Sequence, residues 1–209
     1  MSPSELQPHE LMQIMADFFE SQGINYRVVG SLASRVYGEP RFTNDVDIVA
    51  ELRLENLPAL CAAFPSPDYY LSEPAARDAI TKRFQFNILH PSSGLKVDII
   101  VPPDTEFSRS EAGRIRRIAS EGEKSAWFGS PEDVLLYKLV YYRLSGGISD
   151  KHLRDREPLI ERSFVFHGGS FGSGSPGAIS KCECTSINWS RWNTCWSIMV
   201  NKVAATFTN

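Results

Sequence analysis

The sequence predicts an α/β (α+β) fold, in which helices pack against a small mixed β-sheet. Two observations carry this prediction. Segments with alternating apolar and polar residues, typical of strands, are separated by segments whose apolar residues recur at helical spacing. Gly, Pro and Ser stand between many of these segments, as turn residues do. With 209 residues, 42% of them hydrophobic, the chain is long enough to bury a core.

The elements follow one another in a clear order. We expect helices over residues 5–22, 31–37, 54–64 and 74–80, and strands over residues 25–29, 45–52, 83–89 and 95–101. Residues 106–120 are predicted to form a charged, exposed helix. Ser130 and Pro131, followed by two acids, are typical of a helix start, and this helix should reach Arg143. A further helix is expected from Asp150.

The chain changes character after about residue 162. Residues 163–209 contain one acidic residue, Glu183, but three of the four tryptophans and three of the four cysteines. A Gly/Ser-rich run covers residues 168–177. We therefore predict a folded domain at residues 1–162, and a linker with a poorly specified tail at residues 163–209.

Composition excludes several classes of protein. The net charge of -3 gives no global attraction to nucleic acid or membrane, so such binding would need a local patch. No apolar run approaches the ~20 residues of a membrane span. Residues 1–5 lack the pattern of a signal peptide, and we expect a cytoplasmic protein without membrane contact. The tail cysteines Cys182, Cys184 and Cys195 are a poor match to zinc-ligand spacing.

Two carboxylates close together carry the most specific chemistry. Asp45 and Asp47 lie two residues apart on a predicted strand, so their side chains share one face. Two bare carboxylates that close repel each other, whereas a divalent cation between them becomes the largest local charge. The preceding Gly30-Ser31 turn opens a helix, and a helix start suits a triphosphate.

Asp98 is the third acid, in the middle of an otherwise apolar predicted strand. A desolvated, unpaired carboxylate there costs several kcal/mol. If this strand neighbours that of Asp45 and Asp47 with matching faces, the three carboxylates converge. Such oxygen ligands suit Mg²⁺, with Mn²⁺ as the alternative. The other interpretation of Asp98 is an edge-strand acid that faces water.

These residues together resemble the minimal nucleotidyltransferases of the DNA polymerase beta-like superfamily. The shared pattern is Gly30-Ser31, then Asp45-x-Asp47, then Asp98 on a following strand. The fuller run GSLASRVYGEPRFTNDVDIV and the later PEDVLLYKLVYYR and SDKHLRD resemble the AbiEii-type toxin branch. The resemblance covers roughly residues 20–157, and it implies a nucleotidyltransferase fold.

The resemblance also implies residue roles. Asp45, Asp47 and Asp98 would bind the metal and act in catalysis; Gly30, Ser31, Arg41 and Lys138 would bind the nucleotide; Thr43 and Asp155 would support them. Arg41 has an alternative role, bracing Glu39 or Asp45. Lys138 has the alternative of an ordinary solvated helix lysine. The basic run Arg114, Arg116 and Arg117 is interpreted either as an RNA contact or as a solvated helix face.

The predicted reaction is attack by an acceptor hydroxyl on the α-phosphate of an NTP, with transfer of NMP and release of pyrophosphate. Resemblance to the toxin branch implies a tRNA 3′ end as acceptor and an antitoxin protein as partner. A protein hydroxyl or a small molecule such as an aminoglycoside remains an open alternative. Two rivals stay open: a non-catalytic binding partner with the same fold, and a phosphotransferase that releases ADP.

Overall fold

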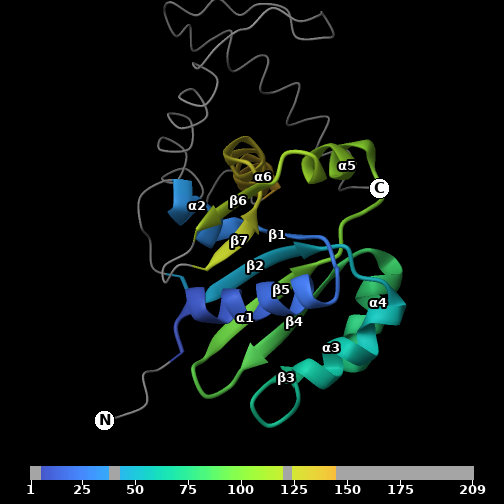
Figure 1. Cartoon of the computed structure of the whole chain (residues 1–209). Helices are drawn as coiled ribbons and strands as arrows, with labels where there is room; N and C mark the ends of the chain where they lie inside the picture. Colours follow the sequence, from blue (N-terminus) through green and yellow to red (C-terminus); the bar gives the residue numbers. More distant parts are fainter. Residues whose placement is uncertain (1–5, 38–42, 120–123, 145–209) are drawn as a thin grey trace, which may run out of the picture.

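The computed structural model describes residues 6–37, 43–119 and 124–144, which form a mixed sheet with helices packed against it (Figure 1). The strands are β1 (Tyr26–Val28), β2 (Asp45–Ala50), β3 (Tyr70–Leu71), β4 (Gln85–His90), β5 (Leu95–Ile100), β6 (Arg116–Ala119) and β7 (Ser125–Phe128). In the described part of the chain their order across the sheet is β3-β4-β5-β2-β1-β7-β6. The pairs β2–β5 and β1–β7 are parallel, and the other pairs are antiparallel. The predicted fold class is therefore confirmed.

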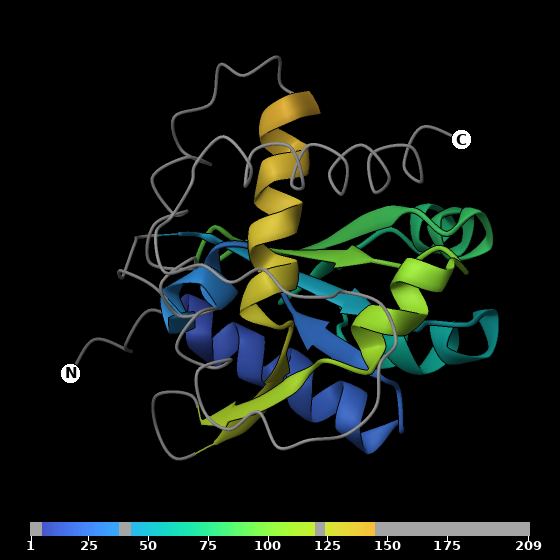
Figure 2. The same cartoon turned by 90° about the horizontal axis from the view of Figure 1, so that it is seen from above.

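The helices are α1 (Pro8–Ser21), α2 (Gly30–Tyr37), α3 (Leu57–Ala63), α4 (Glu73–Lys82), α5 (Glu106–Ala112) and α6 (Pro131–Leu144), with a 3-10 turn η1 (Leu54–Asn56) before α3. In Figure 1, α2, α5 and α6 lie towards the top, whereas α1, α3 and α4 lie lower. Seen from above, α6 runs across the strands (Figure 2). No described helix is both long and apolar enough to cross a membrane.

One face of the sheet forms the main hydrophobic core. Helix α1 contacts β1, β2, β5 and β7 through one stripe of buried residues, Leu11, Met12, Met15, Ala16 and Phe19. On the strands, alternate positions such as Ile48 and Ile99 are fully buried. Burial of a side chain of this size contributes about 1.5–3 kcal/mol, which fixes the strand register because a one-residue slip would expose the whole set.

The opposite face of the sheet carries a buried ion pair. Arg27 lies in register with Val49, which places it on the face that also carries Asp47. Its Nη2 donates to Glu111 Oε2 of α5 at 2.9 Å, and the Tyr137 hydroxyl of α6 donates to the same oxygen at 2.8 Å. Burial raises the pKa of Glu111 despite the opposing effect of Arg27. This pair therefore attaches α5 and α6 to the face of the acids.

The predicted helix over residues 106–120 is wrong in its second half. Helix α5 ends at Ala112 and is followed by Gly113, and residues 116–119 form the edge strand β6 instead. The glycine favours the end of the helix, and antiparallel pairing with β7 satisfies the following backbone groups. The strands β3 and β7 were not predicted either.

The ends of the other predicted elements agree with the structure to within three residues. Helix α6 begins at Pro131, where the Asp133 backbone N–H donates to Ser130 Oγ at 3.2 Å, as the cap sequence predicts. The predicted helix from Asp150, the domain boundary at residue 162 and the tail over residues 163–209 lie outside the described residues.

Replacement of Arg27 tests the buried ion pair. Arg27→Met leaves Glu111, whose side chain is 1% exposed, without the cation that lowers its pKa, and we expect a loss of about 3–5 kcal/mol in the free energy of unfolding. Arg27→Met combined with Glu111→Leu should recover much of this loss, because neither charge of the buried pair remains. Urea unfolding at neutral pH measures both.

The control is Arg77→Met, which breaks an exposed pair with Glu73 of 2.7 Å. This change should cost less than about 1 kcal/mol. If Arg27→Met costs no more than Arg77→Met, the buried pair does not anchor the two helices.

Candidate active site

The turn between β1 and α2 holds the Asp47 carboxylate against the backbone. Gly30 has a φ of 64°, and a Cβ at this position would lie 1.9 Å from Asp47 Oδ2. A backbone hydrogen bond from Ser31 also reaches the Asp47 carboxylate and lowers its pKa. Only glycine fits here, because both the backbone conformation and the space exclude a side chain.

Asp47 and Asp98 lie side by side on neighbouring parallel strands. They are direct register partners between β2 and β5, so both side chains leave the same face of the sheet. Asn87 of β4 is the next register partner beyond Asp98. The next row pairs Asp45 with Lys96. We refer to Asp45, Asp47 and Asp98 as the acidic site.

The environment disfavours charge on Asp47. Burial raises its pKa to about 6, and the neighbouring Asp98 adds to the shift. The Ser31 hydrogen bond and Lys96 act in the opposite direction but do not cancel it. The Asp98 side chain is only 10% exposed, and its Oδ1 atom is buried without a hydrogen-bond partner. The site therefore has more carboxylate oxygens than positive groups that contact them.

Lys96 is the functional candidate that sequence reasoning missed. Its Nζ lies 2.8 Å from Asp98 Oδ2 and 3.5 Å from Asp45 Oδ1. The hydrogen bond that Lys96 donates to Asp98 is the main cause that raises the pKa of the lysine. The signal was present in the sequence, because Lys96 precedes Asp98 by two residues on the same strand and shares its face.

The donor chemistry of the acidic site fits a divalent cation. No group of three His, Cys, Asp or Glu side chains within the described ranges is already arranged to hold a metal ion. However, a cation between these residues would give the orphaned Asp98 Oδ1 a partner, and it would lower the raised pKa of Asp47. Carboxylate oxygens are also the ligands that Mg²⁺ and Mn²⁺ prefer.

The remaining predicted residues fall into two groups. Thr43 fixes the start of β2, since its Oγ1 accepts from the Asp45 backbone N–H at 3.3 Å and donates to the Asp45 carbonyl at 3.2 Å. Lys138 is buried on α6, which contradicts its alternative interpretation as a solvated helix lysine. Arg41 and Asp155 lie outside the described residues.

Helix α2 is held in place at both of its ends. At its start, the Val29 N–H donates to the Asp47 carbonyl at 2.9 Å, and the Ser34 hydroxyl donates to the Gly30 carbonyl at 2.8 Å. At its end, the buried Tyr37 hydroxyl donates to the Gly129 carbonyl at 2.9 Å, just before α6. The helix therefore has a fixed position between the acidic site and α6.

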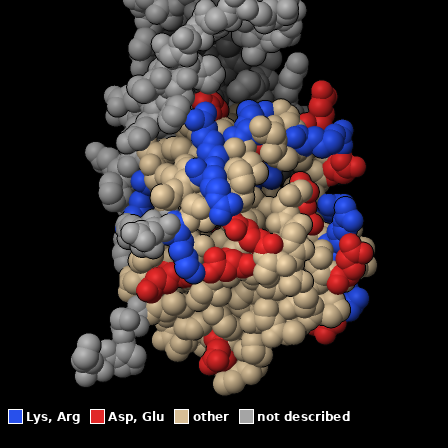
Figure 3. All heavy atoms as spheres, in the orientation of Figure 1, with Lys and Arg blue, Asp and Glu red and all other residues tan. Residues whose placement is uncertain are grey.

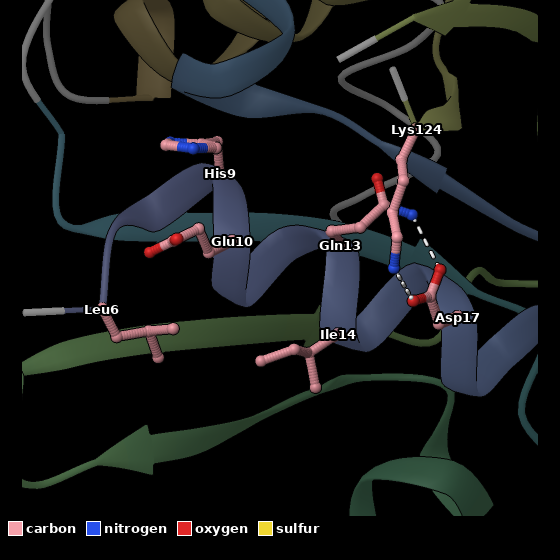
Figure 4. A pocket seen from close by; sticks show the side chains of 7 residues that line it. All are labelled: Leu6, His9, Glu10, Gln13, Ile14, Asp17 and Lys124. Carbon is pink, nitrogen blue, oxygen red and sulfur yellow. Dashed lines mark hydrogen bonds and ion pairs between the residues drawn. The ribbon is translucent and has the colours of Figure 1, made fainter. Parts of the chain in front are cut away.

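A cavity of about 540 Å³ lies elsewhere, along the outer side of α1 (Figure 4). Its lining residues are Leu6, His9, Glu10, Gln13, Ile14, Asp17 and Lys124. None of the predicted site residues lines it. The Asp17 carboxylate already accepts from Lys124 Nζ and from Gln13 Nε2, both at 2.8 Å, so this lysine is engaged by an acid. The cavity therefore does not suit a triphosphate.

Comparison with known proteins supports the fold. No protein-family model and no curated protein matches the sequence. Among solved structures, the lincomycin-bound lincosamide antibiotic adenylyltransferase LnuA is 14% identical, with a TM-score of 0.53 over 76% of this chain and 99% of that one. The crystal structure of ANT(2")-Ia in complex with adenylyl-2"-tobramycin is 13% identical, with a TM-score of 0.50 over 77% of this chain and 94% of that one. The chain therefore has the fold of these nucleotidyltransferases.

Proposed function

We propose that this protein is a metal-dependent nucleotidyltransferase, which moves NMP from an NTP to an acceptor hydroxyl. The observation that carries the proposal is the register pairing of Asp47 with Asp98, beside the Gly30–Ser31 turn. The fold shared with two adenylyltransferases supports it. The AbiEii-type toxin branch rests on the sequence resemblance alone.

Each group of the site has a distinct role. The acidic site would hold a divalent cation, which supplies charge compensation at the α-phosphate when bound and lowers the pKa of the attacking hydroxyl. The Gly30–Ser31 turn lies at a helix start, and the positive end of the helix would attract the phosphates. The Asp98 carboxylate would accept the proton of the acceptor hydroxyl. A new O–P bond then forms at the α-phosphate, the bond to the bridging oxygen breaks, and pyrophosphate leaves.

We infer that the favoured acceptor is a small-molecule hydroxyl. Two residues of the basic run that could have met RNA are engaged by acids: Arg114 donates to both oxygens of Asp133, and Arg117 pairs with Glu20 at 3.3 Å. On the face seen in Figure 3, acidic and basic side chains lie close together. A tRNA 3′ end, with an antitoxin as partner, is the second candidate, because the resemblance to the toxin branch favours it.

Replacement of Asp98 tests the proposed reaction. Asp98→Asn keeps the shape of the side chain but removes its negative charge and its capacity to take a proton, and we expect transfer to fall at least about 100-fold. The assay combines each α-labelled NTP with Mg²⁺ and, in separate arms, lincosamides, aminoglycosides and total tRNA. The control, Asp78→Asn, changes an exposed acid of α4 and should keep activity.

The arms of this assay also separate the rivals. Label on tRNA but on no antibiotic supports the second candidate acceptor. Release of ADP instead of pyrophosphate supports a phosphotransferase. Transfer that survives both Asp98→Asn and Asp47→Asn would contradict the proposed site.

The raised pKa of Asp47 makes stability depend on pH. Its folded-state pKa is about 6 and its ordinary value is 3.8, so the protonated form is favoured on folding. The cost of ionising Asp47 is therefore absent below about pH 4, grows through pH 6, and reaches roughly 3 kcal/mol above pH 7. In EDTA, we expect Asp47→Asn to become more stable relative to the natural chain as pH rises through this window.

Urea unfolding at several pH values measures the difference, with Asp78→Asn as the control for loss of an exposed carboxylate. Addition of Mg²⁺ at about pH 7.5 should stabilise the natural chain but not Asp47→Asn. A stability difference that stays constant between about pH 4 and pH 7 would show that the folded protein does not raise the pKa of Asp47.

Replacement of Gly30 tests the turn. Gly30→Ala introduces a Cβ where the Asp47 carboxylate now lies, so both stability and transfer should fall. Gly94→Ala is a matched control, because Gly94 has a similar φ of 68° but nothing within 4 Å of the added Cβ. Backbone strain alone costs about 1 kcal/mol. Equal losses in both variants would mean that contact with Asp47 is unimportant.

A further inference from the structure

Lys96 is the positive side chain that the structure shows against the acidic site. Its ammonium reaches carboxylates from two strands, Asp98 on its own strand β5 and Asp45 on β2. The lysine is 34% exposed and Asp45 is 49% exposed, whereas Asp98 is nearly buried. The ammonium thus lies at the open side of the site, between two of the three carboxylates.

This position is the one that a divalent cation would need. A cation shared by Asp98 and Asp45 would approach the same two carboxylates that the ammonium now contacts through Asp98 Oδ2 and Asp45 Oδ1. Two cations cannot both lie within a few ångströms of each other and of these oxygens without strong repulsion. Within the described residues no three His, Cys, Asp or Glu side chains already form a metal-ligand group. The ammonium lies against one oxygen of Asp98 and one oxygen of Asp45.

We propose that Lys96 is an internal counter-cation, which holds the acidic site together in the metal-free protein and is displaced when a divalent cation binds. This inference rests on the proposed function in one respect, since it takes the three carboxylates as cation ligands. The ammonium limits repulsion among the acids, so the site stays assembled without metal. Metal affinity is lowered as a result, because the contacts of Lys96 with Asp98 and Asp45 must be broken before the metal binds.

Displacement of Lys96 is geometrically feasible. The side chain is partly exposed and has a flexible four-carbon stem, so the ammonium can turn towards solvent without a change in the backbone. Once displaced, the positive charge remains tethered beside the bound cation, where the negative phosphates of a nucleotide would meet it. A nucleotide should therefore favour the displaced position, and metal and nucleotide should bind cooperatively.

The test compares Mn²⁺ binding by Lys96→Met, Lys96→Arg and the natural chain without nucleotide. Electron paramagnetic resonance of unbound Mn²⁺ gives the affinity directly, and no catalysis is needed. We expect Lys96→Met to bind Mn²⁺ about 3- to 10-fold more tightly, because no internal cation competes. Lys96→Arg keeps the charge and should stay within about 2-fold of the natural chain.

Stability in EDTA provides a second measurement. Removal of the ammonium leaves the carboxylates uncompensated, so Lys96→Met should unfold at a lower temperature in EDTA and gain more than the natural chain on addition of Mn²⁺. The matched control is Lys82→Met, which breaks a surface pair with Asp78 of the same 2.8 Å length. This control should change neither Mn²⁺ affinity nor the gain on Mn²⁺ addition.

The outcomes separate this inference from the proposed function. Equal or weaker Mn²⁺ binding by Lys96→Met, in a protein whose natural form binds Mn²⁺ at the acidic site, overturns the counter-cation role but leaves the nucleotidyltransferase proposal intact. If the natural chain and Lys96→Met both fail to bind Mn²⁺, the acidic site is not a cation site, and both proposals fail. Tighter binding by Lys96→Met but not by Lys96→Arg supports the counter-cation.

Discussion

The parallel pairing of β2 with β5 is the constraint on which the site depends. It places Asp47 and Asp98, which are far apart in the sequence, in one row on one face of the sheet. On the other face, Ile48 and Ile99 are register partners and are fully buried. The hydrophobic core therefore fixes the register that brings the carboxylates together, and the stability of the core compensates for their repulsion.

The face that carries the acids is organised by buried polar groups. Arg27, Glu111 and Tyr137 join β1 to α5 and α6, and the Tyr37 hydroxyl joins the end of α2 to the start of α6. Such contacts are costly to break because each leaves a buried group without its partner. They attach α5 and α6 to the face of the sheet that carries the acidic site.

Sequence reasoning found most of this frame but missed specific parts of it. The Asp45-x-Asp47 spacing was sufficient to predict a shared face for these two acids, since side-chain direction in a strand follows from spacing alone. Asp98 was predicted to join them only if the two strands are neighbours with matching faces, and the register of β2 with β5 meets this condition. Strands β6 and β7 were missed because pairing with distant strands, which spacing does not reveal, stabilises them. The contacts of Lys96 with Asp45 and of Arg27 with Glu111 are also long-range, so they required the structure.

The most direct test of the central claim is a crystal structure with Mn²⁺ and a non-hydrolysable NTP analogue, in which anomalous scattering locates the metal. The account predicts a Mn²⁺ peak within about 2.5 Å of carboxylate oxygens from both Asp47 and Asp98, with the Lys96 ammonium turned away from Asp98. A Mn²⁺ peak that contacts neither residue, or an Asp98 side chain on the opposite face of the sheet, would contradict the account.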